Sequence, residues 1–135
     1  MEREVVFEEK NLRLEYSENG NYLCLIWGLH TPEPYFKSKI DEIMKISEER
    51  NVSGFYVDTV NNKGISPGSQ EYAARKVEEY ANKRELFKQA FVVPPDIFSK
   101  FSVESYSKKV QDYSGNVVLQ FFDSETAACA WLEEN

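Results

Sequence analysis

The sequence contains few residues that bind metals or form covalent cross-links. Its 135 residues include one histidine, His30, and two cysteines, Cys24 and Cys129. The spacing of the cysteines fits neither a zinc site nor a redox pair, and the apolar residues around each predict a buried free thiol. No glycine-rich phosphate-binding loop is present either. We therefore expect no metal site and no bound cofactor.

The sequence also lacks long apolar segments. No run of about 18 apolar residues is present that could span a membrane. The first residues, Met1-Glu2-Arg3-Glu4, lead directly into a short alternating segment rather than into the apolar part of a signal peptide. These absences predict a cytoplasmic protein without a membrane partner.

Basic residues are outnumbered by acidic ones, and the net charge is −7. A nucleic-acid partner is therefore not expected, because such binding needs many cations to displace counterions from phosphates. The charge is uneven, since residues 61–109 carry more bases than acids whereas residues 110–135 carry five acids and no base. The middle segment is a candidate region for an anionic ligand, and a mixed solvated surface accounts for the same pattern.

What the sequence does contain is enough apolar material for one domain over residues 1–135. The hydrophobic fraction is 41% and the aromatic fraction 14%, which predicts a large aromatic core. Alternation of apolar and polar residues predicts short strands at 4–8 and 12–16. A hairpin signal, Asn19-Gly20, then leads into an apolar strand at 22–27.

After residue 28, helical and extended patterns alternate. Further strands are predicted at 55–58, 87–93 and 117–122. The predicted helix starts are Thr31 with Pro32, Ser66 with Pro67, Ser99 or Ser102, and Asp123 or Ser124; Asn51 should end the first helix, and the last should bury Ala127, Ala128, Trp131 and Leu132. The order βββαβαβαβα predicts an α/β fold. Its sheet should be mixed and largely parallel, with an N-terminal antiparallel hairpin extension and about four helices.

Several short segments follow one another in order from about Leu12 to Leu132. They are Val57-Asp58-Thr59, Gly64-Ile65-Ser66-Pro67, Gln70-Glu71-Tyr72, Phe91-Val92-Val93-Pro94, Phe98-Ser99 with Ser102, and Phe121-Phe122-Asp123 with Ala127, Ala128, Trp131 and Leu132. Together they resemble STAS-like domains, small relatives of the sporulation anti-sigma-factor antagonist. The resemblance implies the STAS-like form of the α/β fold. It implies little about activity, because most of these small relatives have no assigned function.

The antagonist branch of that family carries a phosphorylation switch. An aspartate at a strand end is followed at once by hydroxyl residues at a helix start, and a kinase phosphorylates one of them to break partner binding. Here Asp58 is followed by Thr59 and then by Val60, and the expected helix start at Ser66 lies eight positions after Asp58. The spacing departs from the antagonist pattern. The resemblance therefore gives Thr59 and Ser66 as phosphorylation candidates without establishing a switch.

Ligands in an open α/β sheet usually bind beyond the carboxyl ends of its parallel strands. Strand ends at Trp27, Asp58 and Val93 should share such an edge, where helix starts favour an anion. The candidate binding or phosphorylation residues there are Asp58, Thr59, Lys63, Ser66, Ser69, Ser99 and Ser102. They predict a non-catalytic binding or regulatory module that recognises a partner protein or a small anionic ligand.

The polar residues of this edge are also compatible with a purely structural role, because helix capping and turn formation account for several of them. A homodimer or larger homo-oligomer with a structural or interaction role is a second possibility, and it would expose Tyr35, Tyr72 or Tyr113 at its interface. A hydrolase is a third. It would place Ser66 or Ser99 within hydrogen-bonding distance of His30, with Asp58 nearby, although no strained nucleophile turn is present.

Overall fold

The computed structural model describes residues 2–93 and 116–134. Along this part of the chain the elements are β1 (Glu4–Glu8), β2 (Leu12–Ser17), β3 (Tyr22–Trp27), α1 (Glu33–Arg50), β4 (Gly54–Asp58), α2 (Pro67–Ala81), β5 (Phe87–Val92), β6 (Val117–Phe122) and α4 (Glu125–Leu132). The described strands form one sheet in sequence order. β1, β2 and β3 pair antiparallel, and β3 to β6 pair parallel. The α/β class and the mixed sheet are therefore confirmed, whereas the helix expected from Ser99 or Ser102 lies outside the described residues.

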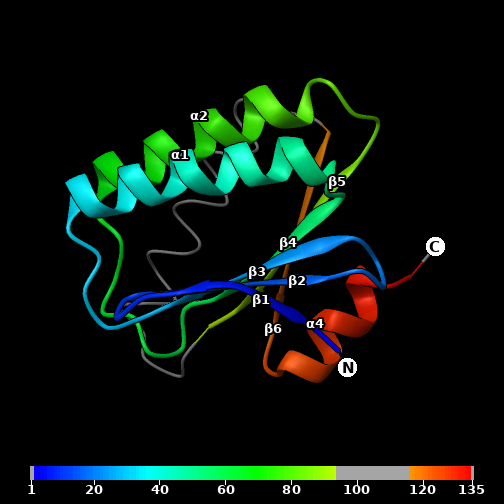
Figure 1. The fold of residues 1–135 in the computed structure, drawn as a ribbon, viewed down its shortest axis with the longest axis horizontal. Helices are drawn as coiled ribbons and strands as arrows, with labels where there is room; N and C mark the ends of the chain where they lie inside the picture. Colours follow the sequence, from blue (N-terminus) through cyan, green and yellow to red (C-terminus); the bar gives the residue numbers. More distant parts are fainter. Residues whose placement is uncertain (1, 94–115, 135) are drawn as a thin grey trace.

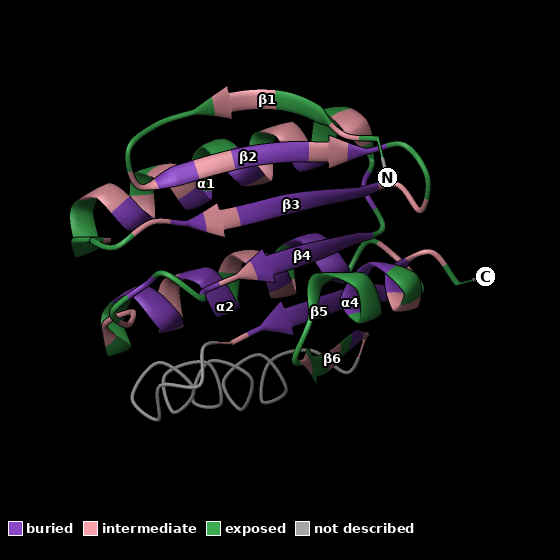
Figure 2. Cartoon of the chain, turned by 90° about the horizontal axis from the view of Figure 1, so that it is seen from below, coloured by how far each residue is buried: buried purple, intermediate pink, exposed green. Residues whose placement is uncertain are grey.

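The sheet is covered on both faces. α1 and α2 lie side by side on one face, and α4 lies on the other (Figure 1). Side chains alternate along each strand, so Leu23, Leu25 and Trp27 of β3 pack under α1 and α2, whereas Tyr22 and Cys24 pack toward α4. β3, β4 and β5 are consequently buried over most of their length (Figure 2). This is why β3 and most of β4 are apolar rather than alternating, whereas β5 also contains Lys88 and Gln89.

The helix ends follow from particular residues. Asn51 adopts the left-handed conformation, with φ 52° and ψ 50°, and ends α1 as expected. Ser66 caps α2 and Ser124 caps α4 through their hydroxyl oxygens. The prediction that Thr31 caps the first helix is wrong, because α1 begins at Glu33 after Pro32 and has no side-chain cap.

One further expectation about α4 is corrected. Ala127 is exposed, whereas Ala128 and Leu132 are buried and Trp131 is half-buried. The buried stripe also includes Cys129. An eight-residue helix that crosses the sheet presents only a narrow stripe to it, so Ala127 at the start of the helix faces solvent.

Arg3 joins the N-terminal segment to α4 beneath the second face of the sheet. Its guanidinium lies 3.1 Å from Glu15 Oε1 of β2 and 2.8 Å from Glu125 Oε2 of α4, and the side chain is only 9% exposed. The same group donates to Cys129 Sγ at 2.9 Å and lies 5.2 Å from the centre of the Tyr56 ring. A buried guanidinium needs such partners, because its charge cannot leave water without them.

We expect Glu15→Gln to destabilise the fold in a pH-dependent way. Burial raises the pKa of the Glu15 carboxyl, but hydrogen bonds from Arg13 and Arg3 outweigh burial and hold that pKa below its usual range. The stabilisation from Glu15 is therefore full above the unfolded-state pKa of about 4.3 and is lost as the pH falls through the folded-state pKa. Urea denaturation should show a loss of about 1–3 kcal/mol at neutral pH that shrinks toward pH ~3.

The control for this prediction is Glu71→Gln. Glu71 pairs with Arg75 across one turn of α2, at 2.8 Å, and both side chains are well exposed. Its removal should change the free energy of unfolding by less than about 0.5 kcal/mol at either pH. A Glu15→Gln loss that is the same at neutral and acid pH would contradict the role given to the ionised carboxylate.

Candidate functional site

Three loops meet at the edge where the parallel strands end. They are the turn at residues 9–11, the loop at 28–32 after β3 and the loop at 59–66 after β4. The Gly28 N–H donates to Asn11 O at 2.8 Å, and the Lys63 N–H donates to Leu29 O at 3.3 Å. The prediction that the loops after Trp27 and Asp58 share one edge is confirmed, and the loop after Val93 lies outside the described residues.

The Asn62 side chain is the main link between the loops after β3 and β4. It is 5% exposed. Its Nδ2 donates to Gly28 O at 2.8 Å and to Thr31 Oγ1 at 3.3 Å. Its Oδ1 accepts from the Gly64 N–H at 2.8 Å. One buried amide therefore satisfies backbone groups in both loops, which would otherwise be costly to bury.

The turn at residues 9–11 approaches the same edge because position 28 is glycine. A Cβ atom added to Gly28 would lie 2.7 Å from Asn11 Cα and 2.9 Å from Lys10 O, both of which are backbone atoms. The approach lets the Asn11 side chain bridge the turn to the next loop, since its Oδ1 accepts from the His30 N–H at 3.2 Å. Two asparagines and one glycine thus fix all three loops relative to one another.

Asp58 and Thr59 build the turn at the end of β4. Asp58 Oδ1 accepts from the Val60 N–H at 3.0 Å, and Oδ2 accepts from the Tyr56 hydroxyl at 3.1 Å. Burial, and after it the Asp58 carboxylate, raises the pKa of Tyr56, so that phenol stays protonated as the donor. Thr59 is 2% exposed and donates its hydroxyl to Val92 O at 3.3 Å. These contacts give both residues structural roles.

The start of α2 already holds an acidic side chain. Glu33 Oε1 accepts from the Ser66 hydroxyl at 2.8 Å, and a Cβ atom on Gly68 would lie 2.5 Å from the same oxygen. The hydrogen bond from Ser66, followed by the bond and charge of Lys37, holds the pKa of Glu33 below its usual range. Glu33 thus occupies the helix terminus that the sequence suggested for an external anion. Ser69, in the first turn, is fully buried.

The residues that the joined loops present to solvent differ from most of the predicted set. We call this surface the strand-end platform and define it by six exposed residues: Lys10, Leu29, His30, Val60, Asn61 and Lys63. Only Lys63 belongs to the predicted candidates, while Ser99 and Ser102 lie outside the described residues. Leu29 is 47% and Val60 41% exposed. The sequence feature that could have identified Leu29 and Val60 is the position of an apolar residue in a loop between a strand end and a helix start.

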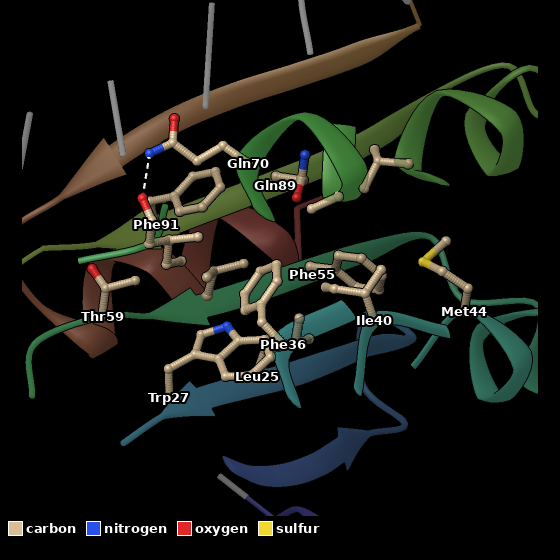
Figure 3. Close-up of a pocket in the computed structure, with 14 residues that line it drawn as sticks. Leu25, Trp27, Phe36, Ile40, Met44, Phe55, Thr59, Gln70, Gln89 and Phe91 are labelled. Atoms are coloured by element: carbon tan, nitrogen blue, oxygen red, sulfur yellow. Dashed lines mark hydrogen bonds between the residues drawn. The ribbon is translucent and has the colours of Figure 1, made fainter. Parts of the chain in front are cut away.

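A small cavity lies between the helices and the sheet. It is lined mostly by apolar side chains from β3, β4, β5, α1 and α2 (Figure 3), and its volume is about 40 Å³. Gln70 is one of its lining residues. Its Nε2 donates to Ile65 O at 2.7 Å, and its buried Oε1 has no hydrogen-bond partner among the described residues. A water needs about 10–15 Å³, and a cavity that binds benzene is nearer ~150 Å³. The cavity is therefore too small for an organic ligand.

Several groups with reactive chemistry are held in unreactive settings. Cys24 and Cys129 are buried free thiols, as predicted, and burial raises the pKa of Cys24 away from the reactive thiolate. The Ser66 hydroxyl donates to Glu33, and no hydrogen bond joins Ser66 to His30 in the described part of the chain. Within residues 2–93 and 116–134, no cluster of three or more His, Cys, Asp or Glu side chains is placed to hold a metal ion.

The tyrosines expected at a homo-oligomer interface do not project freely. Tyr35 and Tyr72 are half-buried rather than exposed. The Tyr35 hydroxyl donates to Glu9 Oε1 at 2.8 Å, and the Tyr72 hydroxyl donates to Asp41. Tyr113 lies outside the described residues. Tyr35 and Tyr72 therefore belong to contacts within the chain.

Comparisons with protein-family models, with curated proteins and with solved structures gave no match for this chain. The STAS-like resemblance accordingly remains a prediction from the sequence. Among the helices of the described residues, none combines the length and the apolar character that a membrane span requires.

We expect Asn62→Ala to lower the free energy of unfolding by about 2–3 kcal/mol, because it leaves buried backbone groups of two loops without hydrogen bonds. Asn61→Ala is the matched control, since Asn61 is the exposed neighbour in the same loop and its loss should change stability by no more than about 0.5 kcal/mol. Urea denaturation measures both. Equal effects of the two variants would show that Asn62 does not hold the loops together.

The contact between Ser66 and Glu33 yields a second stability prediction. Ser66→Ala should cost about 1 kcal/mol, because the cap of α2 is lost. Ser66→Asp keeps a cap acceptor but places a carboxylate against that of Glu33, so it should also be destabilising at neutral pH. In the Glu33→Gln background, the loss of unfolding free energy caused by Ser66→Asp should become smaller, whereas the loss caused by Ser66→Ala should stay the same. If Ser66→Asp costs the same in both backgrounds, Glu33 does not occupy the start of α2 in solution.

Proposed function

We propose that this chain is a non-catalytic binding module that recognises a partner protein through the strand-end platform. The observation that carries the proposal is the rigid joining of three loops by Asn11, Asn62 and Gly28 beneath an exposed surface. Loops that are fixed before binding lose little conformational entropy when a partner docks. Exposed aliphatic side chains on such loops give that partner apolar area to cover.

The same geometry favours a protein over a small anion. Glu33 lies at the start of α2, where it accepts a hydrogen bond and would repel an incoming anion. The sequence suggested Asp58, Thr59 and Ser69 as further contacts for such an anion. Asp58 and Thr59 are hydrogen-bonded within the chain, and Ser69 is buried. The interior cavity of about 40 Å³ does not offer an alternative pocket for an organic molecule.

The STAS-like resemblance supports the same class of function. In the antagonist branch, phosphorylation of a hydroxyl residue that follows the strand-end aspartate breaks partner binding, and the corresponding segment here is the one after Asp58. The proposal extends to a STAS-like form of the fold. It does not include a phosphorylation switch at Thr59, because that hydroxyl is buried and bonded to Val92 O.

A site-specific photo-cross-linking experiment tests the proposal. A photoreactive amino acid is placed at Asn61 on the platform and, in a separate protein, at Leu86, which is 49% exposed and follows α2 at the opposite end of the sheet. Mass spectrometry of products formed in the native cell should show a defined partner only from position 61. Leu29→Asp with Val60→Asp should abolish that product, and Leu86→Asp should not.

Three other results would count against the proposal. The same products from both positions would show that the platform is not the binding surface. A cross-linked product from position 61 that persists in the Leu29→Asp and Val60→Asp double variant would also show that the platform is not the binding surface. Cross-links of position 61 only to a second copy of this chain, together with a dimer mass by light scattering, would favour the homo-oligomer instead.

A further inference from the structure

We infer that the partner segment bound by the strand-end platform is acidic and partly apolar. This inference rests on the proposed function and adds the chemistry of the partner. It is carried by the two platform lysines, which have no carboxylate partner among the described residues, and by the two aliphatic side chains beside them.

The platform lysines differ from most cations of the described chain in lacking a carboxylate partner. Lys10 and Lys63 are exposed, and no ion pair involves either of them within residues 2–93 and 116–134. By contrast, Lys37 lies 3.1 Å from Glu33, and Lys39 lies 2.8 Å from Glu9. A chain with a net charge of −7 thus presents, on one preorganised surface, two lysines that have no ion pair with any described residue.

Three acidic side chains that are close to the platform in the sequence are engaged in contacts within the described part of the chain. Asp58 accepts from the Val60 N–H and the Tyr56 hydroxyl. Glu9 accepts from the Tyr35 hydroxyl and from Lys39, both at 2.8 Å. Glu33 accepts from Ser66 and pairs with Lys37. These contacts occupy the three carboxylates, and no ion pair joins any of them to Lys10 or Lys63 within residues 2–93 and 116–134. Carboxylates of a partner could therefore pair with the two lysines.

The aliphatic side chains decide between kinds of acidic partner. Leu29 and Val60 are nearly half exposed, and they lie in loops that also carry His30 and Lys63. A protein segment in which Asp or Glu alternates with large apolar residues would cover these side chains and pair with the lysines. Nucleic acid would meet the lysines but would leave the aliphatic side chains unused, and it would be repelled by the net charge of the chain.

The test uses a random 12-residue peptide display library as the probe, selected on the intact protein at low ionic strength. Peptides that depend on Leu29 and Val60 should be enriched in Asp and Glu together with Leu, Ile or Phe. Lys10→Glu with Lys63→Glu should weaken such peptides roughly tenfold. Lys45→Glu with Lys83→Glu changes the net charge equally, but outside the platform, and should weaken them less than about twofold. Raising the salt concentration should weaken binding to the wild type.

Each alternative result bears on a definite claim. Platform-dependent peptides without enrichment in acidic residues, unaffected by Lys10→Glu with Lys63→Glu, would overturn this inference and leave the proposed function intact. Peptides that bind equally well after Leu29→Asp with Val60→Asp would overturn the proposed function itself. Vesicles containing phosphatidylserine form the second arm. If they bind the wild type and lose that binding with the two platform lysines reversed, the ligand is an anionic lipid surface and the acidic protein segment is excluded.

Discussion

The amide of Asn62 joins the ends of β3 and β4, and the surface beyond both strands depends on it. Where two parallel strands end, the backbone groups of the following loops no longer have ladder partners and must find others. Asn62 supplies a donor to Gly28 O and an acceptor to the Gly64 N–H from one buried side chain. Because the amide is buried, water cannot easily replace it, and the two loops are held as one unit.

The internal use of polar groups determines which side chains remain exposed at this edge. Asp58, Thr59 and Ser66 are each bonded to groups of the same chain, and Glu33 takes the helix terminus that an external anion would need. What is left for a partner is two aliphatic side chains and two lysines, with His30 and Asn61 beside them. The surface is therefore better suited to a protein–protein interface than to the binding of a small molecule, because such an interface has an apolar centre surrounded by polar groups.

The strands and the α/β class could be predicted well from the sequence. For the central strand β3 the reason is that burial on both faces leaves a continuous apolar pattern. Residues 22–27 and 117–122 are strands with the predicted bounds. The prediction for Thr31 fails because a threonine before proline resembles an N-cap, whereas its hydroxyl accepts from Asn62 of the neighbouring loop. The roles of Arg3 and Glu33 could not be predicted either. Each depends on a contact between elements far apart in the chain, which local patterns do not encode.

Topology places the loops after β3 and β4 at one edge of the sheet, as predicted. Several of the polar candidates at that edge are bonded within the chain, and the reason is physical. Polar residues near strand ends are the obvious candidates for ligand binding in a sequence. The fold, however, uses the same residues as hydrogen-bond partners for the backbone groups of its own loops and helix termini. Leu29 and Val60, inconspicuous in a sequence, stay exposed although burial would be favourable. Isolated exposed aliphatic residues are ordinary on a protein surface. Here, however, two of them lie on loops that are fixed together, beside two lysines that have no carboxylate partner among the described residues. One partner could cover the apolar area of this surface and pair with its charges.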